Sequence, residues 1–251
     1  MNDIGIIIQA RTGSTRLNSK TIIPFWNEKG ILELLLEKLI LSTKVPIIVA
    51  TTVNNNDDKI EQLVNKFITI RLYRGSEENV LNRYIEAATK FRINKIIRIC
   101  ADNPFLELKS LLILINRFND DNVDYLGFSV NGIPSIKTHY GFWAEGVSIH
   151  ALIKTSELTA EKKYQEHVTN YIYENSNIFN VDFIEVQTQF NNSIRLTLDT
   201  QEDFEIQKTI FKQIMNKYPA HEYQISDIIK YLDNNPEFYK RMLVQINNQK
   251  K

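Results

Sequence analysis

The sequence predicts an α/β protein with a mostly parallel central sheet and helices on both faces of that sheet. Two observations support this fold class. Short apolar runs alternate with segments of helical periodicity through the first half of the chain, and 43% of the 251 residues are hydrophobic, which is ample for a buried core. Such alternation is typical of doubly wound parallel sheets. We expect a single domain over residues 1–251.

The first element is expected to be a strand over Ile4–Ile8, because this run is too short and too apolar for an amphipathic helix. Further strands are expected over 47–52, 70–73 and 96–100. The helices that alternate with them are expected over 31–40, 57–67, 77–91 and 106–118. This order predicts a series of βαβ units in the first half of the chain.

The pattern changes after Asp124, where apolar strand-like runs become more frequent. Strands are expected over 125–130, 139–149, 181–186 and 194–198. Helices are expected over 160–173, 202–218 and 226–231. We therefore expect an inserted β-rich and helical subregion at about 130–180, and a frayed basic end over 240–251.

The composition excludes several classes of protein. Lys and Arg number 30, as do Asp and Glu, and this balance argues against non-specific nucleic-acid binding as the main task. A lone cysteine, Cys100, allows no intramolecular disulfide, suits a reducing compartment and is expected to be a small buried strand residue. No apolar stretch approaches membrane-spanning length and no signal peptide is visible, so we expect a cytoplasmic protein without a membrane partner.

The loop after the first predicted strand has the composition of a polyphosphate-binding site. It reads Gln-Ala-Arg-Thr-Gly-Ser-Thr-Arg-Leu-Asn-Ser-Lys over residues 9–20. Open α/β sheets bind ligands at the carboxyl ends of their strands, and a triphosphate there needs hydroxyl and backbone donors together with flexible cations. Those groups are present on Arg11, Ser14, Arg16 and Lys20. The alternative interpretation of this loop is a basic turn that is exposed to solvent and binds no phosphate.

Other nucleotide-binding and metal-binding motifs are incomplete or absent. Ser19-Lys20-Thr21 resembles the end of a Walker A loop, but the glycine before the lysine is missing and the chain continues into the apolar run 22–25 instead of a helix. No G-x-G-x-x-G fingerprint, G-x-S-x-G elbow or H-E-x-x-H motif is present. Zinc chemistry and a dinucleotide cofactor are therefore not expected.

Two aspartates follow predicted strands at positions that would face the cation-rich loop. Asp102 ends the apolar run before Pro104, and Asp199 ends the run 194–198. Two hard oxygen ligands beside a triphosphate imply Mg²⁺. A helix cap is the alternative role for Asp199, with Thr200 and Asp203 as a capping box. The pairs 57–58 and 77–78 are expected to enrich the first turns of helices.

Taken together, these segments resemble the cytidylyltransferase family of the CMP-Kdo and CMP-sialic acid synthetases, and most closely its spore-coat-polysaccharide branch. The resemblance covers most of the chain. The segments that carry it are 9–20, 74–84, 98–104, 141–145, 166–169 and 195–203. Several ordered motifs of this kind make chance agreement improbable.

The resemblance implies a Rossmann-like nucleotidyltransferase fold and the transfer of CMP from CTP to a sugar acid or other small acidic or phosphorylated acceptor, with release of pyrophosphate, for surface polysaccharide biosynthesis. It also implies a homodimer formed partly by the inserted subregion. By the same resemblance the catalytic residues are Arg11, Lys20 and Asp102, and Mg²⁺ is held by Asp102 and Asp199. The implied nucleotide-binding residues are Ala10, Arg11, Gly13, Ser14, Arg16, Lys20, Thr52, Gly75, Ser76 and Arg83. The implied acceptor-binding residues are Trp143, Glu145, Glu166 and His167.

The chain departs from the family pattern at two places. Asn18-Ser19 replaces the usual Pro-Gly before Lys20, and Trp143 stands where an acid is expected in Gly-x-Asp-x-Glu. An indole cannot accept a proton from a sugar hydroxyl, so a smaller phosphorylated or carboxylated alcohol becomes a plausible acceptor. Trp143 is otherwise a core or interface aromatic.

Two other functions are considered. A glycosyltransferase of related fold would need an Asp-x-Asp triplet at a strand end, and none occurs there. A nucleotide-binding module without catalysis is opposed by the presence of both Asp102 and Asp199.

Overall fold

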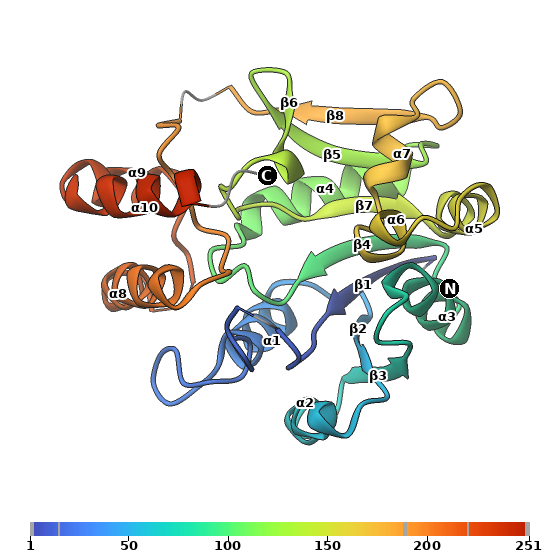
Figure 1. Ribbon diagram of the computed structural model, residues 1–251, viewed down its shortest axis with the longest axis horizontal. Coiled ribbons are helices and arrows are strands. Elements are labelled where there is room, and N and C mark those ends of the chain that lie inside the picture. The colour runs from blue at the N-terminus through green and yellow to red at the C-terminus, as the bar shows by residue number, and fades with distance from the viewer. Residues whose placement is uncertain (1–2, 15, 188–189, 220, 249–251) are drawn as a thin grey trace.

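A mixed sheet of eight strands forms the centre of the computed structural model, which describes residues 3–14, 16–187, 190–219 and 221–248 (Figure 1). The strands are β1 (Ile4–Gln9), β2 (Ile47–Thr52), β3 (Ile70–Gly75), β4 (Lys95–Cys100), β5 (Tyr125–Val130), β6 (Ile133–Pro134), β7 (Glu145–Ser148) and β8 (Val181–Glu185). The α-helices are α1 (Ile31–Ser42), α2 (Asp58–Val64), α3 (Val80–Phe91), α4 (Leu108–Asp120), α5 (Ile149–Leu158), α6 (Lys162–Glu166), α7 (Asn170–Glu174), α8 (Gln201–Lys217), α9 (Ile225–Asp233) and α10 (Glu237–Asn248). Single 3-10 turns form η1 (Asn55–Asp57) and η2 (Ser135–Lys137).

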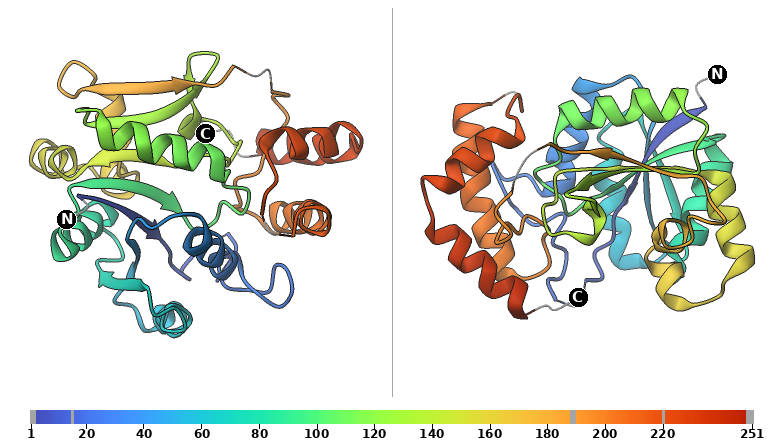
Figure 2. Two further views of the ribbon diagram at one scale, coloured as in Figure 1. Left: turned by 180° about the vertical axis from the view of Figure 1, so that it is seen from behind. Right: turned by 90° about the horizontal axis from the view of Figure 1, so that it is seen from above.

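The strand order places the ends of β1, β2 and β4 at one edge of the sheet. Parallel strands run in the order β3-β2-β1-β4, β7 pairs antiparallel with both β4 and β5, and β8 is a parallel neighbour of β5. Helices α1 and α4 pack on one face, and α3 and α5 pack on the other (Figure 2). The predicted α/β fold is therefore confirmed, and the loops after β1, β2 and β4 leave the sheet on the same side.

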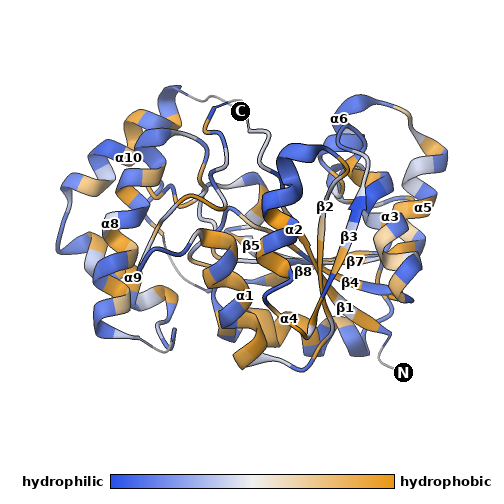
Figure 3. Ribbon diagram, turned by 90° about the horizontal axis from the view of Figure 1, so that it is seen from below, coloured by the Kyte–Doolittle hydropathy of each residue, from blue (hydrophilic) through white to orange (hydrophobic). Residues whose placement is uncertain are grey.

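Two-sided burial of β1 explains its apolar sequence. Ile6 and Ile8 belong to the core beneath α1 and α4, whereas Ile7 belongs to the core beneath α3 and α5, and all three are completely buried. The central strands are accordingly apolar along most of their length in Figure 3, while the helices carry hydrophilic residues on their outer sides. A strand of this kind needs no alternation of apolar and polar residues.

The C-terminal helices α8, α9 and α10 form a group beyond the edge where β1 and β4 end (Figure 1). Phe211 of α8 makes edge contacts with Phe25 and Phe105, at ring-centroid distances of 5.2 and 5.7 Å. These contacts join the helical group to the segments that follow the loop after β1 and the end of β4. The basic end that we expected to be frayed is helical up to Asn248, because Phe238 and Met242 are buried one turn apart. Residues 249–251 lie outside the described part of the chain.

The predicted helix over 160–173 is wrong, because the chain forms two short helices there, α6 and α7. His167 ends α6 with a non-helical backbone conformation. Val168 and Thr169 then enter the core, where they are 0% and 1% exposed, and the Thr169 hydroxyl donates to the Glu145 carboxylate at 3.2 Å. Burying these two side chains requires the break.

The predicted strand over 139–149 is too long, and the predicted strand over 194–198 does not form. Only Glu145–Ser148 forms a strand, and α5 follows it at once with Ser148 as its N-cap. Residues 194–198 form no strand, because the backbone N–H groups of Leu196 and Thr197 both donate to one carbonyl, that of His139. Gly141, with φ of 68°, allows this close approach, since a Cβ there would lie 2.5 Å from the Leu196 carbonyl oxygen.

A buried ion pair positions the start of α8. Arg195 is 1% exposed, and its Nε and Nη2 atoms donate to the two oxygens of Asp203 at 2.8 and 3.0 Å. Asp203 also completes the capping box with Thr200, as expected. Removing one partner of a buried ion pair leaves the other charge uncompensated.

We therefore expect Asp203→Asn to destabilise the fold by about 3–5 kcal/mol, because Arg195 loses a buried charged partner and α8 loses part of its cap. Urea denaturation followed by circular dichroism measures this. Glu205→Gln is the matched control, since Glu205 is an exposed acid on the same helix. Equal urea midpoints for the two variants would contradict the account.

Candidate active site

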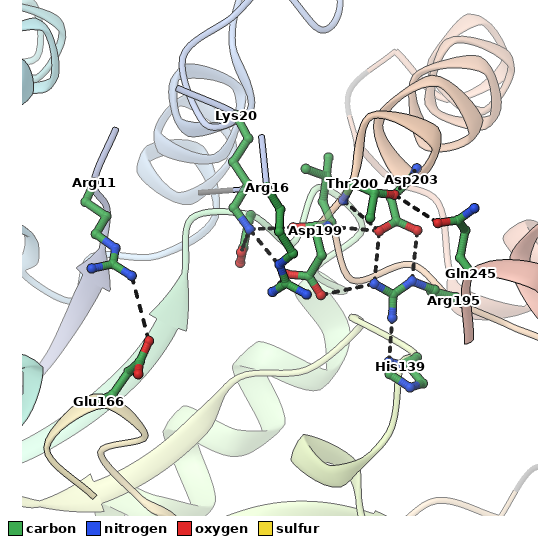
Figure 4. Close-up of polar contacts among 12 residues, drawn as sticks. Arg11, Arg16, Lys20, His139, Glu166, Arg195, Asp199, Thr200, Asp203 and Gln245 are labelled. Atoms are coloured by element: carbon green, nitrogen blue, oxygen red, sulfur yellow. Dashed lines mark hydrogen bonds and ion pairs between the residues drawn. The ribbon is translucent and has the colours of Figure 1, made fainter. Parts of the chain in front are cut away.

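Lys20 lies between the two aspartates that the sequence singled out. Its ammonium nitrogen is 2.6 Å from Asp102 Oδ2 and 3.5 Å from Asp199 Oδ1, and it also donates to the Leu198 carbonyl at 2.5 Å (Figure 4). Asp102 follows β4, and Asp199 directly precedes the N-cap of α8. The prediction that both acids face the loop after β1 is confirmed.

Asp199 is held in place by the buried Arg195–Asp203 pair. Arg195 Nη2 donates to Asp199 Oδ2 at 3.0 Å, and the Asp199 backbone N–H donates to Asp203 at 3.0 Å. The helix cap itself is Thr200, whose side chain accepts from the backbone of Asp203. Asp199 is therefore not the cap of α8, and its second carboxylate oxygen faces Lys20 and Arg16.

Charge pairing keeps Lys20 protonated despite its burial, with its side chain only 12% exposed. Burial lowers the pKa of Lys20, but the ion pairs with Asp102 and Asp199 outweigh it, so that the pKa is raised overall. The site thus contains a fixed positive charge that faces two carboxylates. A second cation, Arg16, lies 2.9 Å from Asp199 Oδ1 on a more exposed side chain.

The donor set at Lys20 fits Mg²⁺ that arrives with a phosphate ligand. Two carboxylate oxygens from distant parts of the chain converge on one cation, which is the arrangement that a divalent ion shared by Asp102 and Asp199 would need. Within the described residues, no group of three or more His, Cys, Asp or Glu side chains could hold a metal alone. Mg²⁺ commonly takes one or two carboxylates and completes its shell with phosphate oxygens and water.

The loop after β1 separates its cations into two places. Arg16 and Lys20 lie beside Asp199, whereas Arg11 lies 3.8 Å from Glu166 on the other side of the site (Figure 4). Ala10 is buried at the end of β1. Gly13 and Ser14 line a separate cavity of about 340 Å³, together with Thr12, Asn18, Ser19, Asn56 and Lys59. Thr15, part of the same motif, lies outside the described residues.

Ser19, which replaces the glycine of the family pattern before Lys20, has a glycine-like backbone conformation. Its φ is 57°, in the left-handed region that favours glycine, the residue that the family resemblance implies here. Its backbone N–H donates to the Thr12 carbonyl at 2.9 Å and so closes the loop before Lys20. The loop therefore keeps the backbone that a glycine would allow, at a cost of about 1–2 kcal/mol in backbone strain. No helix starts at Lys20 in the described chain, as expected for a site unlike the Walker A loop.

Asp57 is a site residue that the sequence did not reveal. As expected it lies at a helix start, in η1 directly before α2, but its side chain makes no cap and is buried at 2% exposure. Its carboxylate instead accepts hydrogen bonds from Thr12, in the loop after β1, and from Thr52, the last residue of β2. The hydroxyl of Thr52 is thus engaged by Asp57. An aspartate at a helix start is an ordinary cap signal, so local sequence could not distinguish this contact.

Gly75, Ser76 and Arg83 lie close together at the end of β3 and on α3. Arg83 is completely buried, and its Nη1 donates to the Ser76 carbonyl at 2.5 Å. Its Nε and Nη2 atoms have no hydrogen-bond partner in the described part of the chain. Burial lowers the pKa of Arg83, and the positive charge of Arg11 lowers it further. Buried donors without a partner are rare in folded proteins, and a bound ligand is one group that would satisfy them.

A cleft of about 690 Å³ opens beside Asp102 and Asp199. All four residues expected to bind an acceptor line it, namely Trp143, Glu145, Glu166 and His167. Glu145 is 3% exposed and is held by Arg98 Nη1 and the Tyr125 hydroxyl, each at 2.5 Å. Cys100, expected to be fully buried, is half-buried and lines the same cleft because it is the last residue of β4.

Trp143 belongs to both the core and the cleft. It is 8% exposed, its ring stacks on Phe128 at 5.8 Å, and it makes edge contacts with Phe142, Tyr140 and Phe190. It therefore forms an apolar wall of the cleft that its neighbours hold in one orientation. It also lines a second cavity of about 550 Å³ on the side of α4 and α9.

The chain is similar to known proteins in both sequence and fold. The cytidylyltransferase family model matches residues 5–246. The chain is 33% identical over 244 residues to the spore coat polysaccharide biosynthesis protein SpsF of Bacillus subtilis, a match that covers 94% of this chain and 97% of that protein. A cytidylyltransferase from Leptospira borgpetersenii has a similar structure, with a TM-score of 0.82 and 28% identity over 94% of this chain and 96% of the other.

A solved CMP:2-keto-3-deoxy-manno-octonic acid synthetase, complexed with CTP, shares the fold at a TM-score of 0.62 and 19% identity, over 84% of this chain and 99% of that chain. Among the described residues, no helix is both long and apolar enough to cross a lipid bilayer. The family model and the Bacillus relative each match nearly the whole length of this chain. The chain therefore belongs to the cytidylyltransferase family and is a nucleotidyltransferase.

Proposed function

We propose that this protein transfers CMP from CTP to a hydroxyl group of a small acidic or phosphorylated acceptor, such as a sugar acid, and releases pyrophosphate. The observation that carries the proposal is the position of Lys20 between Asp102 and Asp199, at the mouth of a cleft large enough for a sugar-sized acceptor. This arrangement provides a cation for phosphate and two carboxylates for Mg²⁺ in one place. It also argues against a module that binds nucleotides without catalysis.

The choice of CTP is supported by the unpaired donors of Arg83. Cytosine presents two adjacent hydrogen-bond acceptors, O2 and N3, whereas N3 of uracil carries a hydrogen. The parallel Nε–H and Nη2–H groups of a guanidinium match the cytosine pair and oppose the uracil pattern. Gly75 lets the Arg83 side chain pack closely against the end of β3, since a Cβ there would lie 3.2 Å from Arg83 Cγ.

In the proposed reaction the acceptor oxygen forms a bond to the α-phosphorus, the bond from that phosphorus to the bridging oxygen breaks, and the hydroxyl proton is released. Negative charge grows on the departing pyrophosphate. Lys20, Arg16 and Arg11 are placed to stabilise that charge as it grows. Bound Mg²⁺, held by Asp102 and Asp199, would neutralise charge on the phosphate oxygens.

The acceptor is proposed to occupy the cleft beyond Asp102. Lys137 on its wall offers a positive charge for an acidic group of the acceptor, and Trp143 offers an apolar face for its carbon skeleton. Trp143 supplies no proton acceptor, so the reacting hydroxyl is oriented by other groups of the cleft. The similarity to the spore coat protein supports a role in surface polysaccharide biosynthesis. We also predict that the protein forms a homodimer, from the family resemblance, and that it is cytoplasmic, from its sequence.

CTP is expected to bind more tightly than ATP, GTP or UTP in the presence of Mg²⁺, as measured by isothermal titration calorimetry. Arg83→Lys keeps the charge but loses the paired donors, so we expect it to reduce the preference for CTP over UTP roughly tenfold. Equal affinity of the unaltered protein for all four nucleotides would refute CTP as the substrate.

Asp102→Asn and Asp199→Asn are each expected to lower turnover by on the order of 100-fold, equivalent to about 2.7 kcal/mol, because an amide keeps the size of the side chain but loses the charge that holds Mg²⁺. Pyrophosphate release over a range of Mg²⁺ concentrations measures this. Asp120→Asn, an exposed acid at the end of α4, is the control. Normal turnover and normal Mg²⁺ dependence in Asp199→Asn would show that two carboxylates do not share the metal.

A further inference from the structure

The contacts of Asp57 connect two of the loops that surround the candidate active site. Oδ1 accepts from the backbone N–H and the hydroxyl of Thr12, at 2.7 and 2.6 Å. Oδ2 accepts from the backbone N–H and the hydroxyl of Thr52, at 3.3 and 2.5 Å. Thr12 follows β1 and Thr52 ends β2, so a single side chain connects the loop after β1 to the end of β2.

Asp57 is charged although it is buried. Burial raises the pKa of its carboxyl group, but the hydrogen bonds from Thr12 and Thr52 outweigh this effect, so that the pKa is lowered overall. Among the described residues, no Lys, Arg or His side chain forms an ion pair with it. The carboxylate is therefore stabilised by four convergent donors, and only a group that accepts on both sides can satisfy them.

Thr12 connects Asp57 to the loop over residues 12–20, which we call the phosphate loop. Its carbonyl accepts from the backbone N–H groups of Ser14 and Ser19, at 2.8 and 2.9 Å. The loop that bears Gly13 and ends at Lys20 is thus closed around Thr12. A shift of Thr12 would move the backbone donors of the loop together with the start of the segment that carries Lys20.

Thr52 is itself fixed by contacts that do not involve Asp57. Its hydroxyl accepts from the Asn54 backbone N–H at 3.1 Å, and its carbonyl accepts from Arg74 Nε at 2.8 Å. Arg74 lies on β3, one residue before Gly75. Strands β2 and β3 also pair up to Thr52 and Gly75, so the base-binding side is held without Asp57, whereas the loop after β1 is joined to Asp57 through Thr12.

We propose that Asp57 is a positioning residue that sets the phosphate loop in the conformation that binds the triphosphate. This inference rests on the proposed function, because it assumes that the loop over residues 12–20 receives the phosphates of CTP. Asp57 itself acts through Thr12 and needs no contact with the nucleotide. Its loss should therefore weaken the binding of the phosphates and leave the binding of the base and of the acceptor unchanged.

The test compares the affinities of CTP, inorganic pyrophosphate and cytidine by calorimetry in the unaltered protein and in Asp57→Asn. An asparagine places its amide N–H₂ against two of the donors, so we expect CTP and pyrophosphate to bind roughly tenfold more weakly, with the affinity for cytidine unchanged. Asp58→Asn is the matched control, because Asp58 is the next residue in the chain, is 51% exposed and pairs with Arg74. It should bind all three ligands normally.

A second variant covers the case in which Asp57→Asn does not fold. Thr12→Val keeps the branched shape and the backbone N–H but loses the hydroxyl donor, so its affinity for pyrophosphate should fall in the same direction by a smaller factor. Calorimetry separates this from a structural role, since misfolded protein lowers the measured stoichiometry and leaves the affinity of the folded fraction intact. Unaltered pyrophosphate affinity in the folded variants would overturn the inference. Failure of the unaltered protein to bind CTP would instead overturn the proposed function.

Discussion

The site depends on one interaction, the contact of the Lys20 ammonium group with Asp102 and Asp199. The three residues lie far apart in the sequence, and each is fixed by a different part of the fold. Asp102 is fixed by β4 in the centre of the sheet, and Lys20 by the loop after β1. Because two like charges close together are unfavourable, the carboxylates need a cation between them. In this structure that cation is Lys20, and in the proposed complex with nucleotide it would be Mg²⁺.

Asp199 makes the C-terminal helices part of the site. The buried Arg195 joins it to Asp203 on α8, and α8 packs through Phe211 against residues that follow β1 and β4. A charged group inside the protein thus positions a second charged group at the surface of the cleft. The cost of burying Arg195 is offset by three hydrogen bonds to carboxylates. The helical group therefore serves both stability and the geometry of the site.

The sequence predicted those features that local pattern determines. The first four strands were correct, and three of them, β1, β2 and β4, are largely apolar because they are buried on both faces. The cation-rich loop and Asp102 were found because cations and acids directly after buried strands are conspicuous. The convergence of Asp102 and Asp199 was also anticipated, although the segment before Asp199 forms no strand.

Features that depend on long-range contacts were missed. The break between α6 and α7 exists because Thr169 reaches Glu145, and the helix α10 is stabilised by burial of Met242, which local sequence does not reveal. Asp57 looked like an ordinary helix-start residue. Its contacts with Thr12 and Thr52, 45 and 5 positions away, leave no signal in the local sequence. The most direct test of the central claim is a crystal structure with Mn²⁺ and a non-hydrolysable CTP analogue. We expect the anomalous signal of Mn²⁺ beside Asp102 and Asp199, with the Lys20 ammonium group moved onto the phosphates; Lys20 still between the two carboxylates, with Mn²⁺ and nucleotide elsewhere, would contradict the account.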